Sequence, residues 1–474
     1  MCQDSRQCTP GALFIACAGQ RHHGLEFIAD AMQHGAIAAV FEPSPSMTSK
    51  IADLASRYQR PFIAVPELSR LAGVIAARFY QHPSAQMQVI GVTGTNGKTS
   101  CTHFIAQAME RQQIPAGVIG TLGYGRYRQL RPASHTTPDA LTLQCELAAL
   151  RDQGVESVAM EVSSHALEQG RVSGVQFTGA VLTNLSHDHL DYHGDLASYG
   201  RAKQKLFMLP GLSFAVINSD DEFGRSVAAA LPETARCLRY GLDYDQDRPP
   251  EVRGTITALD RAGMRMQVHT PWGDGMLHSA LLGEFNASNL LAVLCVLLLS
   301  GQTLEQALAN LAQVDAVPGR MEHFGGLGRL PLVVVDYAHT PDALQQVLRS
   351  LRRHCSGRLW CVFGCGGDRD RSKRPLMGAI AAQYADQVIV TDDNPRTEDG
   401  AAIIRQISAG MPSGYHPQVI RNRDQAIAAA VMAAAAGDVV LVAGKGHEDY
   451  QIIGDRRTSF SDREHVRRVL QEVA

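Results

Sequence analysis

The chain has 474 residues, 45% of them hydrophobic and 19% charged, and its 44 basic and 47 acidic side chains give a formal net charge of −3. This length suggests about three domains. The charge balance leaves no excess of positive charge for nucleic-acid phosphates or an anionic membrane, so the composition excludes a histone-like or disordered protein and indicates a soluble multidomain globule.

The first 85 residues predict a small α/β domain. Short apolar runs at residues 12–18, 36–41 and 61–65 alternate with amphipathic stretches. The longest of these stretches, residues 68–80, has the periodicity of a helix and is stopped by His82-Pro83.

Residues 86–319 predict a second and larger α/β domain. An apolar strand at 87–92 leads into a glycine-rich turn and a helix at 98–111, and further buried strands are expected at 157–160, 179–183 and 215–218. Their continuous apolar character predicts a mostly parallel sheet covered by helices. The hydrophobic period changes to two at 252–281, as in an antiparallel patch, and the apolar helix at 286–299 is expected to be deeply buried.

Breaks at 317–320 and 325–328 precede a third α/β domain, residues 320–474, which we expect to be Rossmann-like. Its expected strands lie at 332–335, 359–363, 387–390, 418–420 and 439–442, with helices between them. The alanine-rich run 426–436 is expected to be one of these helices. The chain is therefore expected to be an α/β protein with domains at 1–85, 86–319 and 320–474.

The cysteines and the apolar runs indicate the compartment. The longest strongly apolar run, residues 290–299, reaches about half of a membrane span, and the first residues lack the pattern of a signal peptide. The ten cysteines form no framework of close pairs, and Cys361 and Cys365 lack a second pair to complete a zinc site. We therefore expect reduced cysteines in a cytoplasmic protein.

Residues 91–100, Gly-Val-Thr-Gly-Thr-Asn-Gly-Lys-Thr-Ser, connect the first central strand to its helix. Glycines let backbone N–H groups converge on phosphate oxygens, and the helix N-terminus adds a partial positive charge. Lys98 is expected to hold the β- and γ-phosphates and the Thr99 hydroxyl to reach Mg²⁺. Although Val92 occupies the first glycine position of the strict Walker pattern, the strand–turn–helix setting predicts a nucleoside triphosphate site. Its residues are Gly94, Thr95, Asn96, Gly97, Lys98, Thr99 and Ser100.

Carboxylates and histidines follow two later strands. Glu161 stands at the carboxyl end of its strand, where ligands gather in such sheets. Residues 187–193 contain three histidines and two aspartates, which fits a zinc site, a polar loop with N-capping aspartates, or part of a magnesium site. Because histidine is an uncommon Mg²⁺ ligand, the spacing alone leaves these interpretations open.

In their order along the chain, the motifs resemble those of the Mur ligases, the ATP-dependent enzymes that add amino acids to the peptidoglycan precursor. Within that family the resemblance is to the members that add meso-diaminopimelate. The matching pieces cover essentially the whole chain. They are Asp4-Ser5-Arg6, Thr136-Thr137-Pro138 and residues 94–100, 161–165, 184–194, 283–286, 319–322, 336–342, 364–375, 393–396 and 444–448.

The resemblance implies roles that the spacing left open. It implies that Glu161 and His189 contact Mg²⁺ together with Thr99, and that Lys203, which alone reads as a solvated helical lysine, carries a carbamate that holds a second Mg²⁺. The further nucleotide contacts that it implies are Asn286, Arg320, Asp336 and His339. The catalytic residues that it implies are Lys98, Lys203, His189 and Arg320.

The resemblance also implies two substrate sites. The residues for the UDP-linked precursor are Ser5, Gln20, Arg21, His22, Thr136, Thr137, Ser163, Gln169 and Arg171. The residues for diaminopimelate are Arg369, Asp393, Asn394, Pro395, Arg396, Gly444 and Glu448. Arg396 can pair bidentately with the carboxylate that distinguishes diaminopimelate from lysine. Members of the family carry a further stretch before the Asp-Ser-Arg motif, so we expect the first strand of this domain to be missing or the start site to be misassigned.

The implied reaction is ligation through an acyl phosphate in peptidoglycan precursor synthesis. ATP phosphorylates the D-glutamyl γ-carboxylate of UDP-MurNAc-L-Ala-D-Glu, and the diaminopimelate amine then attacks it, with Mg²⁺ as cofactor. We expect a monomer whose three domains bind one small-molecule substrate each, with no nucleic-acid partner and no membrane span. The alternatives are a lysine-adding ligase, a folylpolyglutamate synthase, a regulatory nucleotide-binding module and a zinc hydrolase.

Overall fold

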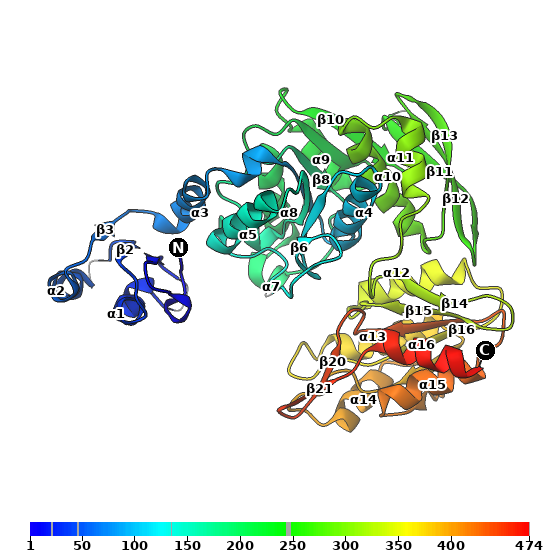
Figure 1. The fold of residues 1–474 in the computed structure, drawn as a ribbon. Helices are drawn as coiled ribbons and strands as arrows, with labels where there is room; N and C mark the ends of the chain where they lie inside the picture. The colour runs from blue at the N-terminus through cyan, green and yellow to red at the C-terminus, as the bar shows by residue number, and fades with distance from the viewer. Residues whose placement is uncertain (20–21, 45–46, 134, 243–247, 474) are drawn as a thin grey trace. The chain divides into compact units, whose positions relative to one another are not determined.

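The computed structural model describes residues 1–19, 22–44, 47–133, 135–242 and 248–473. The chain divides into two compact units, residues 1–239 and 240–474, and each is described by itself (Figure 1).

The first unit begins with a small parallel sheet of order β1-β2-β3, in which Leu13 pairs with Ala38 and Ala39 with Phe62. Apolar side chains of its strands and helices form a core around Phe14, which is fully buried. The α/β character expected for this segment is confirmed. Its elements are η1 (Ser5–Gln7), β1 (Leu13–Ala16), η2 (Gly24–Phe27), α1 (Ile28–Gln33), β2 (Ala38–Phe41), α2 (Thr48–Tyr58), β3 (Phe62–Ala64) and α3 (Leu68–Phe79).

The larger sheet of the first unit has the strand order β9-β8-β4-β7-β5-β6. All described pairings among these strands are parallel except β5 with β6. Its strands are β4 (Gln88–Thr93), β5 (Ala116–Gly120), β6 (Gly123–Arg126), β7 (Ser157–Glu161), β8 (Gly179–Leu182) and β9 (Phe214–Asn218). Because β4 lies between β7 and β8, the carboxyl ends of these three strands meet at one edge, as the mostly parallel sheet predicted.

Helices follow nearly every strand of this sheet. The helix expected at residues 98–111 is α4 (Lys98–Arg111), and its inner turns are almost completely buried. The other helical segments of the first unit are η4 (Pro83–Gln86), α5 (Ala140–Asp152), α6 (Ser164–Glu168), α7 (Leu190–His193), α8 (Leu196–Gln204), η5 (Lys205–Met208) and α9 (Glu222–Ala229).

The second unit begins with an antiparallel meander, which the period-two pattern at 252–281 predicted. It consists of β11 (Val252–Asp260), β12 (Gly263–Thr270) and β13 (Gly273–Ser279). The last residues of β10 (Arg236–Gly241) pair in parallel with β11. Two helices, α10 (Glu284–Leu299) and α11 (Leu304–Leu311), follow. Of the 16 residues of α10, 12 are buried, and no helix of the described residues is long and apolar enough to cross a membrane.

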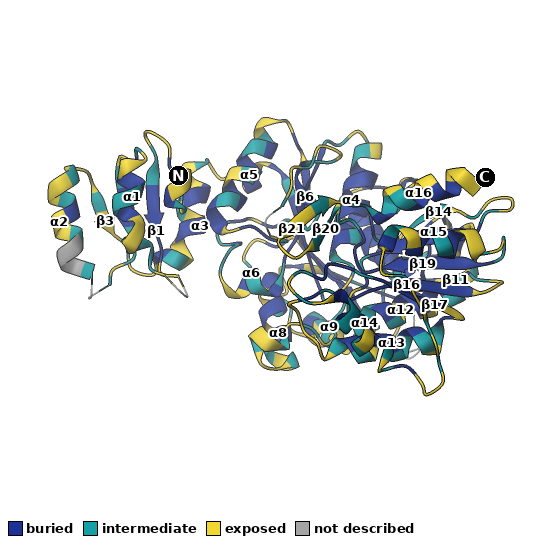
Figure 2. Ribbon diagram, turned by 90° about the horizontal axis from the view of Figure 1, so that it is seen from below, coloured by how far each residue is buried: buried dark blue, intermediate teal, exposed yellow. Residues whose placement is uncertain are grey.

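The rest of the second unit is a six-stranded sheet of order β14-β15-β19-β16-β17-β18, parallel except for its edge strand β14. Alternate strand residues pack into two cores, one under α12, α13 and α14 and the other under α15 and α16, and Figure 2 shows its central strands buried. The strands are β14 (Glu322–Gly325), β15 (Leu332–Asp336), β16 (Leu359–Phe363), β17 (Gln387–Val390), β18 (Gln418–Val419) and β19 (Val439–Ala443). The helices are α12 (Pro341–Arg352), α13 (Lys373–Tyr384), α14 (Gly400–Ser408), α15 (Arg423–Ala433) and α16 (Asp462–Val473), and a hairpin of β20 (Tyr450–Ile453) and β21 (Arg456–Ser459) lies before α16.

Two expectations about local structure are wrong. Cys2 and Cys8 form a disulfide, because the turn at η1 brings their Cα atoms within 5.9 Å, a separation that a disulfide spans. The other eight cysteines form no disulfide, and Cys145 is exposed. The alanine-rich helix also ends early, at Ala433, because Ala434 is extended and the Ala435 N–H donates to the Asp438 side chain.

Candidate active site

The phosphate loop lies between β4 and α4 at the carboxyl edge of the central sheet. Gly94 has φ +147°, and a Cβ there would lie 1.8 Å from the Thr183 hydroxyl oxygen, so only glycine fits. The Asn96 N–H donates to Asn184 Oδ1 (2.9 Å), and the Thr183 hydroxyl donates to the Asn96 carbonyl (2.6 Å). The loop is therefore held by the segment that follows β8.

Two lysines meet above this loop. Lys98 Nζ donates to the carbonyls of Gly94 and Thr95, both at 2.8 Å, and Lys203 Nζ donates to the same Gly94 carbonyl at 2.8 Å. Lys203 is only 1% exposed. Burial, and then the neighbouring Lys98, hold the pKa of Lys203 well below its ordinary value. The lowered pKa favours the neutral amine, which is the form that reacts with carbon dioxide.

Glu161, at the end of β7, is 1% exposed and is surrounded by donors. Its Oε2 accepts from the hydroxyls of Thr99 (3.0 Å) and Thr121 (3.1 Å), and its Oε1 accepts from the Thr121 N–H (2.7 Å). The structure therefore brings Thr99 and Glu161 together, as a metal site requires. Thr121 was missed in the sequence, although its place directly after β5, at the same sheet edge, is a usable signal.

Two of the three histidines of the 184–194 segment, His189 and His193, lie in an aromatic cluster with His165. The ring of His165 lies 5.0 Å from that of His189 and 5.3 Å from that of His193. Burial, and the neighbouring histidines, lower the pKa of His165 and of His193, so both are neutral imidazoles near neutral pH. Among the described residues, no group of three or more histidine, cysteine or acidic side chains is arranged around one ion, which gives the zinc interpretation no support.

Several residues expected to hold the precursor form one network beside Glu161. The Thr137 hydroxyl donates to the Glu161 carbonyl (2.8 Å), and Arg171 Nη1 donates to the Thr137 carbonyl (3.0 Å). Arg171 also donates to Gln169, whose amide nitrogen donates to the Tyr192 hydroxyl oxygen. The remaining members are Thr136, which bonds to Thr121, and Ser163, which bonds to Thr137.

The precursor residues expected near the N-terminus are placed differently. Ser5 is buried at the start of η1, and its carbonyl accepts from the Cys8 N–H, so the structure also fits the simpler interpretation of a turn serine. His22 is exposed, 3.5 Å from Glu26. Gln20 and Arg21 lie outside the described residues.

Three of the four further nucleotide residues cluster around Tyr337 at the end of β15. The Arg320 guanidinium lies 4.5 Å from the centre of the Tyr337 ring, and His339 Nδ1 lies 2.8 Å from the Tyr337 carbonyl. Asp336 accepts from two backbone N–H groups, and burial raises its pKa. Asn286 is not part of this cluster: it is buried in α10, where its amide donates to the Leu282 carbonyl (2.8 Å).

The residues expected to bind diaminopimelate gather at the carboxyl ends of β17 and β19. Asn394 Nδ2 donates to Glu448 Oε2 (3.0 Å). Gly444, at φ +115°, lies so close to Asp393 that a Cβ would be 2.8 Å from its carboxylate. Pro395 lies between Asn394 and Arg396 and packs on Gly367. A Cβ at Gly367 would lie 1.8 Å from the Pro395 carbonyl oxygen.

Arg396 is fixed at both its backbone and its side chain. Its φ is +53°, its N–H donates to the Ile452 carbonyl, and its carbonyl accepts from the Gly454 N–H (2.7 Å). Its Nη1 donates to the Gly367 carbonyl (2.6 Å). A Cβ at Gly366 would meet both Arg396 and Arg369, so both arginines lie beside that glycine.

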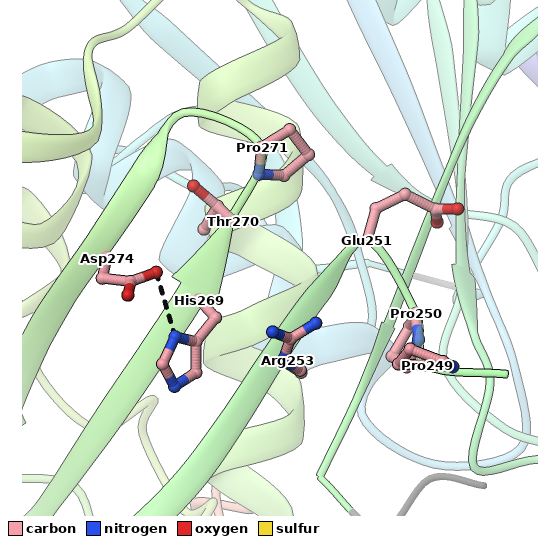
Figure 3. A pocket seen from close by; sticks show the side chains of 8 residues that line it. All are labelled: Pro249, Pro250, Glu251, Arg253, His269, Thr270, Pro271 and Asp274. Carbon is pink, nitrogen blue, oxygen red and sulfur yellow. Dashed lines mark ion pairs between the residues drawn. The ribbon is translucent and has the colours of Figure 1, made fainter. Parts of the chain in front are cut away.

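Two hollows lie in the second unit. One, of about 310 Å³, is bounded by a 2.9 Å ion pair between His269 and Asp274 (Figure 3). Its lining residues are Pro249, Pro250, Glu251, Arg253, His269, Thr270, Pro271 and Asp274. The other, of about 480 Å³, lies beside α15 and the β20–β21 hairpin. Neither is lined by a residue that the sequence predicted to bind substrate.

A glycine-rich loop between a strand and a helix, with buried Thr99 and Glu161 at the same edge of a parallel sheet, defines a P-loop α/β protein. Three family models match the chain: "Mur ligase family, catalytic domain" at residues 1–80, "Mur ligase middle domain" at 92–297, and "Mur ligase, glutamate ligase domain" at 319–446. The chain belongs to the Mur ligase family.

Relatives of known name are similar over nearly their full length. The UDP-N-acetylmuramoyl-L-alanyl-D-glutamate–2,6-diaminopimelate ligase of Alkalilimnicola ehrlichii is 52% identical over 99% of this chain and 94% of its own length. The ligase of the same name from Coxiella burnetii is 48% identical over 98% of this chain and 94% of its own.

Solved structures agree with this placement. One titled as a ligase of the same name has a TM-score of 0.73 at 38% identity, and the match covers 100% of this chain and 94% of that one. The ADP-bound MurF ligase of Thermotoga maritima has a TM-score of 0.65 at 18% identity over 100% of this chain and 98% of its own, a likeness of fold alone. The fold is thus the three-domain α/β architecture of the Mur ligases.

Proposed function

We propose that this chain is the ATP-dependent ligase that joins meso-2,6-diaminopimelate to UDP-MurNAc-L-Ala-D-Glu in peptidoglycan precursor synthesis. The observation that carries the proposal is the presence, in one chain, of the Lys98 phosphate loop beside Glu161 and of the Arg396 cluster with Glu448. The names of the relatives at 48–52% identity support it. Lysine addition is not favoured, because Arg396 suits a carboxylate that lysine lacks.

The chemistry needs an activated carboxyl group, because a carboxylate is a poor electrophile. In the proposed reaction ATP phosphorylates the D-glutamyl γ-carboxylate, and the amine of diaminopimelate attacks this carbon and releases phosphate. Lys98 and the loop N–H groups neutralise the transferring phosphoryl group, and the Thr137–Arg171 network holds the precursor in line.

Magnesium is the proposed cofactor, and the described residues fit it. Buried Glu161 with the Thr99 hydroxyl, the imidazole of His189 and Lys203 as its carbamate would hold Mg²⁺, which would supply charge neutralisation at the phosphates. We expect a Lys203→Ala variant and metal-depleted wild type both to lose substrate-dependent ADP formation, and ¹³C-labelled bicarbonate to give a carbamate signal only in protein that retains Lys203. A signal of equal size in the variant would refute the assignment.

The proposal assigns one substrate to each of three domains, 1–85 for the UDP-precursor, 86–319 for ATP and 320–474 for the amino acid. The matches of the family models at 1–80, 92–297 and 319–446 support this division. Arg320, at the start of the third domain, is the proposed hinge about which that domain closes. The enzyme is proposed to act as a cytoplasmic monomer.

A substrate panel tests the function. Purified protein is given ATP, UDP-MurNAc-L-Ala-D-Glu and either diaminopimelate or lysine, and ADP release is measured. We expect turnover with diaminopimelate and little with lysine. Absence of ADP formation with every amino acid would refute ligase activity, and preference for lysine would refute the substrate assignment.

Arg396 is the residue on which the substrate assignment depends. We expect Arg396→Ala to lower kcat/KM for diaminopimelate by about tenfold to a hundredfold, because hydrogen bonds to a charged carboxylate are lost. Arg405→Ala, an exposed arginine on α14 that is 3.9 Å from Asp399, is the matched control and should change little. Equal kinetics for the two variants would show that Arg396 does not read the carboxylate.

A further inference from the structure

A buried lysine that the proposed function does not use lies inside the diaminopimelate cluster. Lys445 follows β19 and is fully buried. Its Nζ donates to Asn394 Oδ1 and to Glu448 Oε2, both at 3.1 Å, and lies 5.4 Å from the centre of the Tyr450 ring. A buried lysine is stable only when it is paired, so these contacts fix its position.

Lys445 and the Ile452 N–H together determine which way the Asn394 amide points. Turning an asparagine side-chain amide by 180° swaps the positions of its oxygen and nitrogen with little change of shape. The hydrogen-bond donors around the amide therefore decide which way its oxygen points. Asn394 Oδ1 accepts from Lys445 Nζ and from the Ile452 N–H (3.0 Å), so Nδ2 must face Glu448, to which it donates at 3.0 Å. Among the described residues, no partner contacts Glu448 Oε1 or the second hydrogen of Asn394 Nδ2.

The second hydrogen of Asn394 Nδ2 and the Glu448 Oε1 atom form a complementary pair of donor and acceptor. A neutral N–H donor beside an anionic oxygen matches the carboxylate and ammonium of an amino-acid centre. We propose that Lys445 is a positioning and specificity residue that presents Asn394 Nδ2 and Glu448 Oε1 to the distal amino-acid centre of the incoming diamino acid. The identity of that substrate rests on the proposed function, and Lys445, which is buried behind both side chains, does not touch it.

The loop itself is held in place by other contacts, so Lys445 is not needed to fix its course. A Cβ at Gly444 would lie 2.8 Å from Asp393, and a Cβ at Gly319 would lie 2.1 Å from the backbone of His447. The nearby buried cation Arg423 pairs bidentately with Asp462, and among the described residues it makes no hydrogen bond to Asn394 or Glu448. The structural ion pair Arg423–Asp462 is therefore separate from the ion pair Lys445–Glu448.

Loss of the cation predicts a particular change in specificity. Without Lys445 the Glu448 carboxylate loses its paired cation and Asn394 Oδ1 keeps only the Ile452 N–H as a donor, so the site becomes more negative, which repels a carboxylate and still attracts an ammonium. Diaminopimelate carries both groups at its distal centre, whereas lysine carries only the ammonium. The Lys445→Met variant should therefore lose diaminopimelate use far more than lysine use.

The test is steady-state kinetics of the full-length enzyme. For Lys445→Met we expect the KM for diaminopimelate to rise about tenfold or more and the diaminopimelate-to-lysine ratio of kcat/KM to fall, while the KM values for ATP and the UDP-precursor stay within about twofold. Val442→Ala, which opens a cavity in β19 beside this loop, controls for lost stability and should leave all three KM values unchanged. An unchanged KM for diaminopimelate, or an equal rise in all three, overturns the proposal.

A double variant covers the case in which Lys445→Met fails to fold because Glu448 is left unpaired. Lys445→Met with Glu448→Gln leaves no buried charge at this position, and we compare it with Glu448→Gln alone. If Lys445 acts through Glu448 and Asn394, adding Lys445→Met should raise the KM for diaminopimelate by less than about threefold over Glu448→Gln. A larger additional rise overturns the proposal. Failure of the proposed function is distinguishable, because wild type itself would then not respond to diaminopimelate.

Discussion

The lowered pKa of Lys203 has a consequence for stability. Its pKa in the folded protein lies well below the ordinary value of 10.5, because of burial and then Lys98. Folding therefore weakens proton binding by this amine, so the lysine destabilises the fold at pH values below 10.5, and the effect disappears as the pH rises through 10.5.

The prediction is that Lys203→Met melts at a higher temperature than wild type at pH 7 in buffer free of carbon dioxide, and that the difference narrows as the pH approaches 10.5. Gly94 keeps a partner in the variant, because Lys98 donates to the same carbonyl. Lys205→Met, an exposed neighbour paired with Glu168, is the control and should melt like wild type. Thermal melts across this range decide the matter, and a lower midpoint for Lys203→Met at pH 7 would contradict it.

His447 predicts sensitivity to acid. Burial, followed by Arg320 and Arg463, lowers its pKa from 6.5 to about 4. Between these two pH values the unfolded state binds a proton and the folded state does not, so stability falls as the pH drops from 6.5 towards 4. The unfolding free energy of wild type falls as the pH drops from 6.5 to 4. We expect this fall to be about 1–2 kcal/mol smaller in His447→Leu. Denaturant titrations at several pH values test this, and parallel losses in the two proteins would show that other groups cause the acid sensitivity.

At the scale of elements, the β4–α4 connection depends on one glycine. Gly94→Ala places a methyl group 1.8 Å from the Thr183 oxygen at φ +147°, so the loop must move away from the segment after β8. We expect this variant to lose ATP binding and turnover. Gly154→Ala is the matched control, because Gly154 ends α5 at φ +75° with open space around it. The control should lose about 1 kcal/mol of stability and keep its activity; ATP binding by Gly94→Ala at wild-type affinity would contradict the expectation.

The elements that the sequence predicted best are those whose ends are set locally. The strands at 359–363 and 387–390 and the helix at 98–111 have the predicted bounds, because apolar runs or helical patterns end there at polar residues. The helix predicted at 426–436 continues too far at its C-terminal end. Its true end depends on Asp438, whose side chain accepts from the Ala435 N–H after the chain has left the helix. Alanine propensity contains no information about that contact.

In the candidate site, too, features set by neighbouring residues in the sequence were predicted, whereas contacts between distant residues were not. The phosphate loop is contiguous, so its composition alone indicated its chemistry. The partners of Glu161 and Asn394 are not contiguous: Thr121 is 40 residues from Glu161, and Lys445 is 51 residues from Asn394. These contacts follow from strand orders such as β7-β5 and β19-β16-β17, in which neighbours are not consecutive, and such orders are not readable from periodicity.

At the scale of the whole molecule, the anionic substrates meet a protein whose net charge is itself −3. Such a charge gives no long-range attraction for ATP or a UDP-linked precursor, so recognition must come from short contacts such as those of Lys98 and Arg171. Partly buried contacts are screened little by salt, because few ions enter between the groups.

The enzyme should therefore be nearly insensitive to ionic strength. Between about 0.05 and 0.2 M salt we expect the KM values for ATP and the UDP-precursor to change by less than about twofold, since most of the 44 basic side chains are offset by 47 acidic ones and create no attractive field. Initial rates with magnesium held in excess and a non-coordinating salt measure this directly. A steep rise of both KM values with salt would mean that a basic surface steers the substrates, and the short contacts would then not account for recognition.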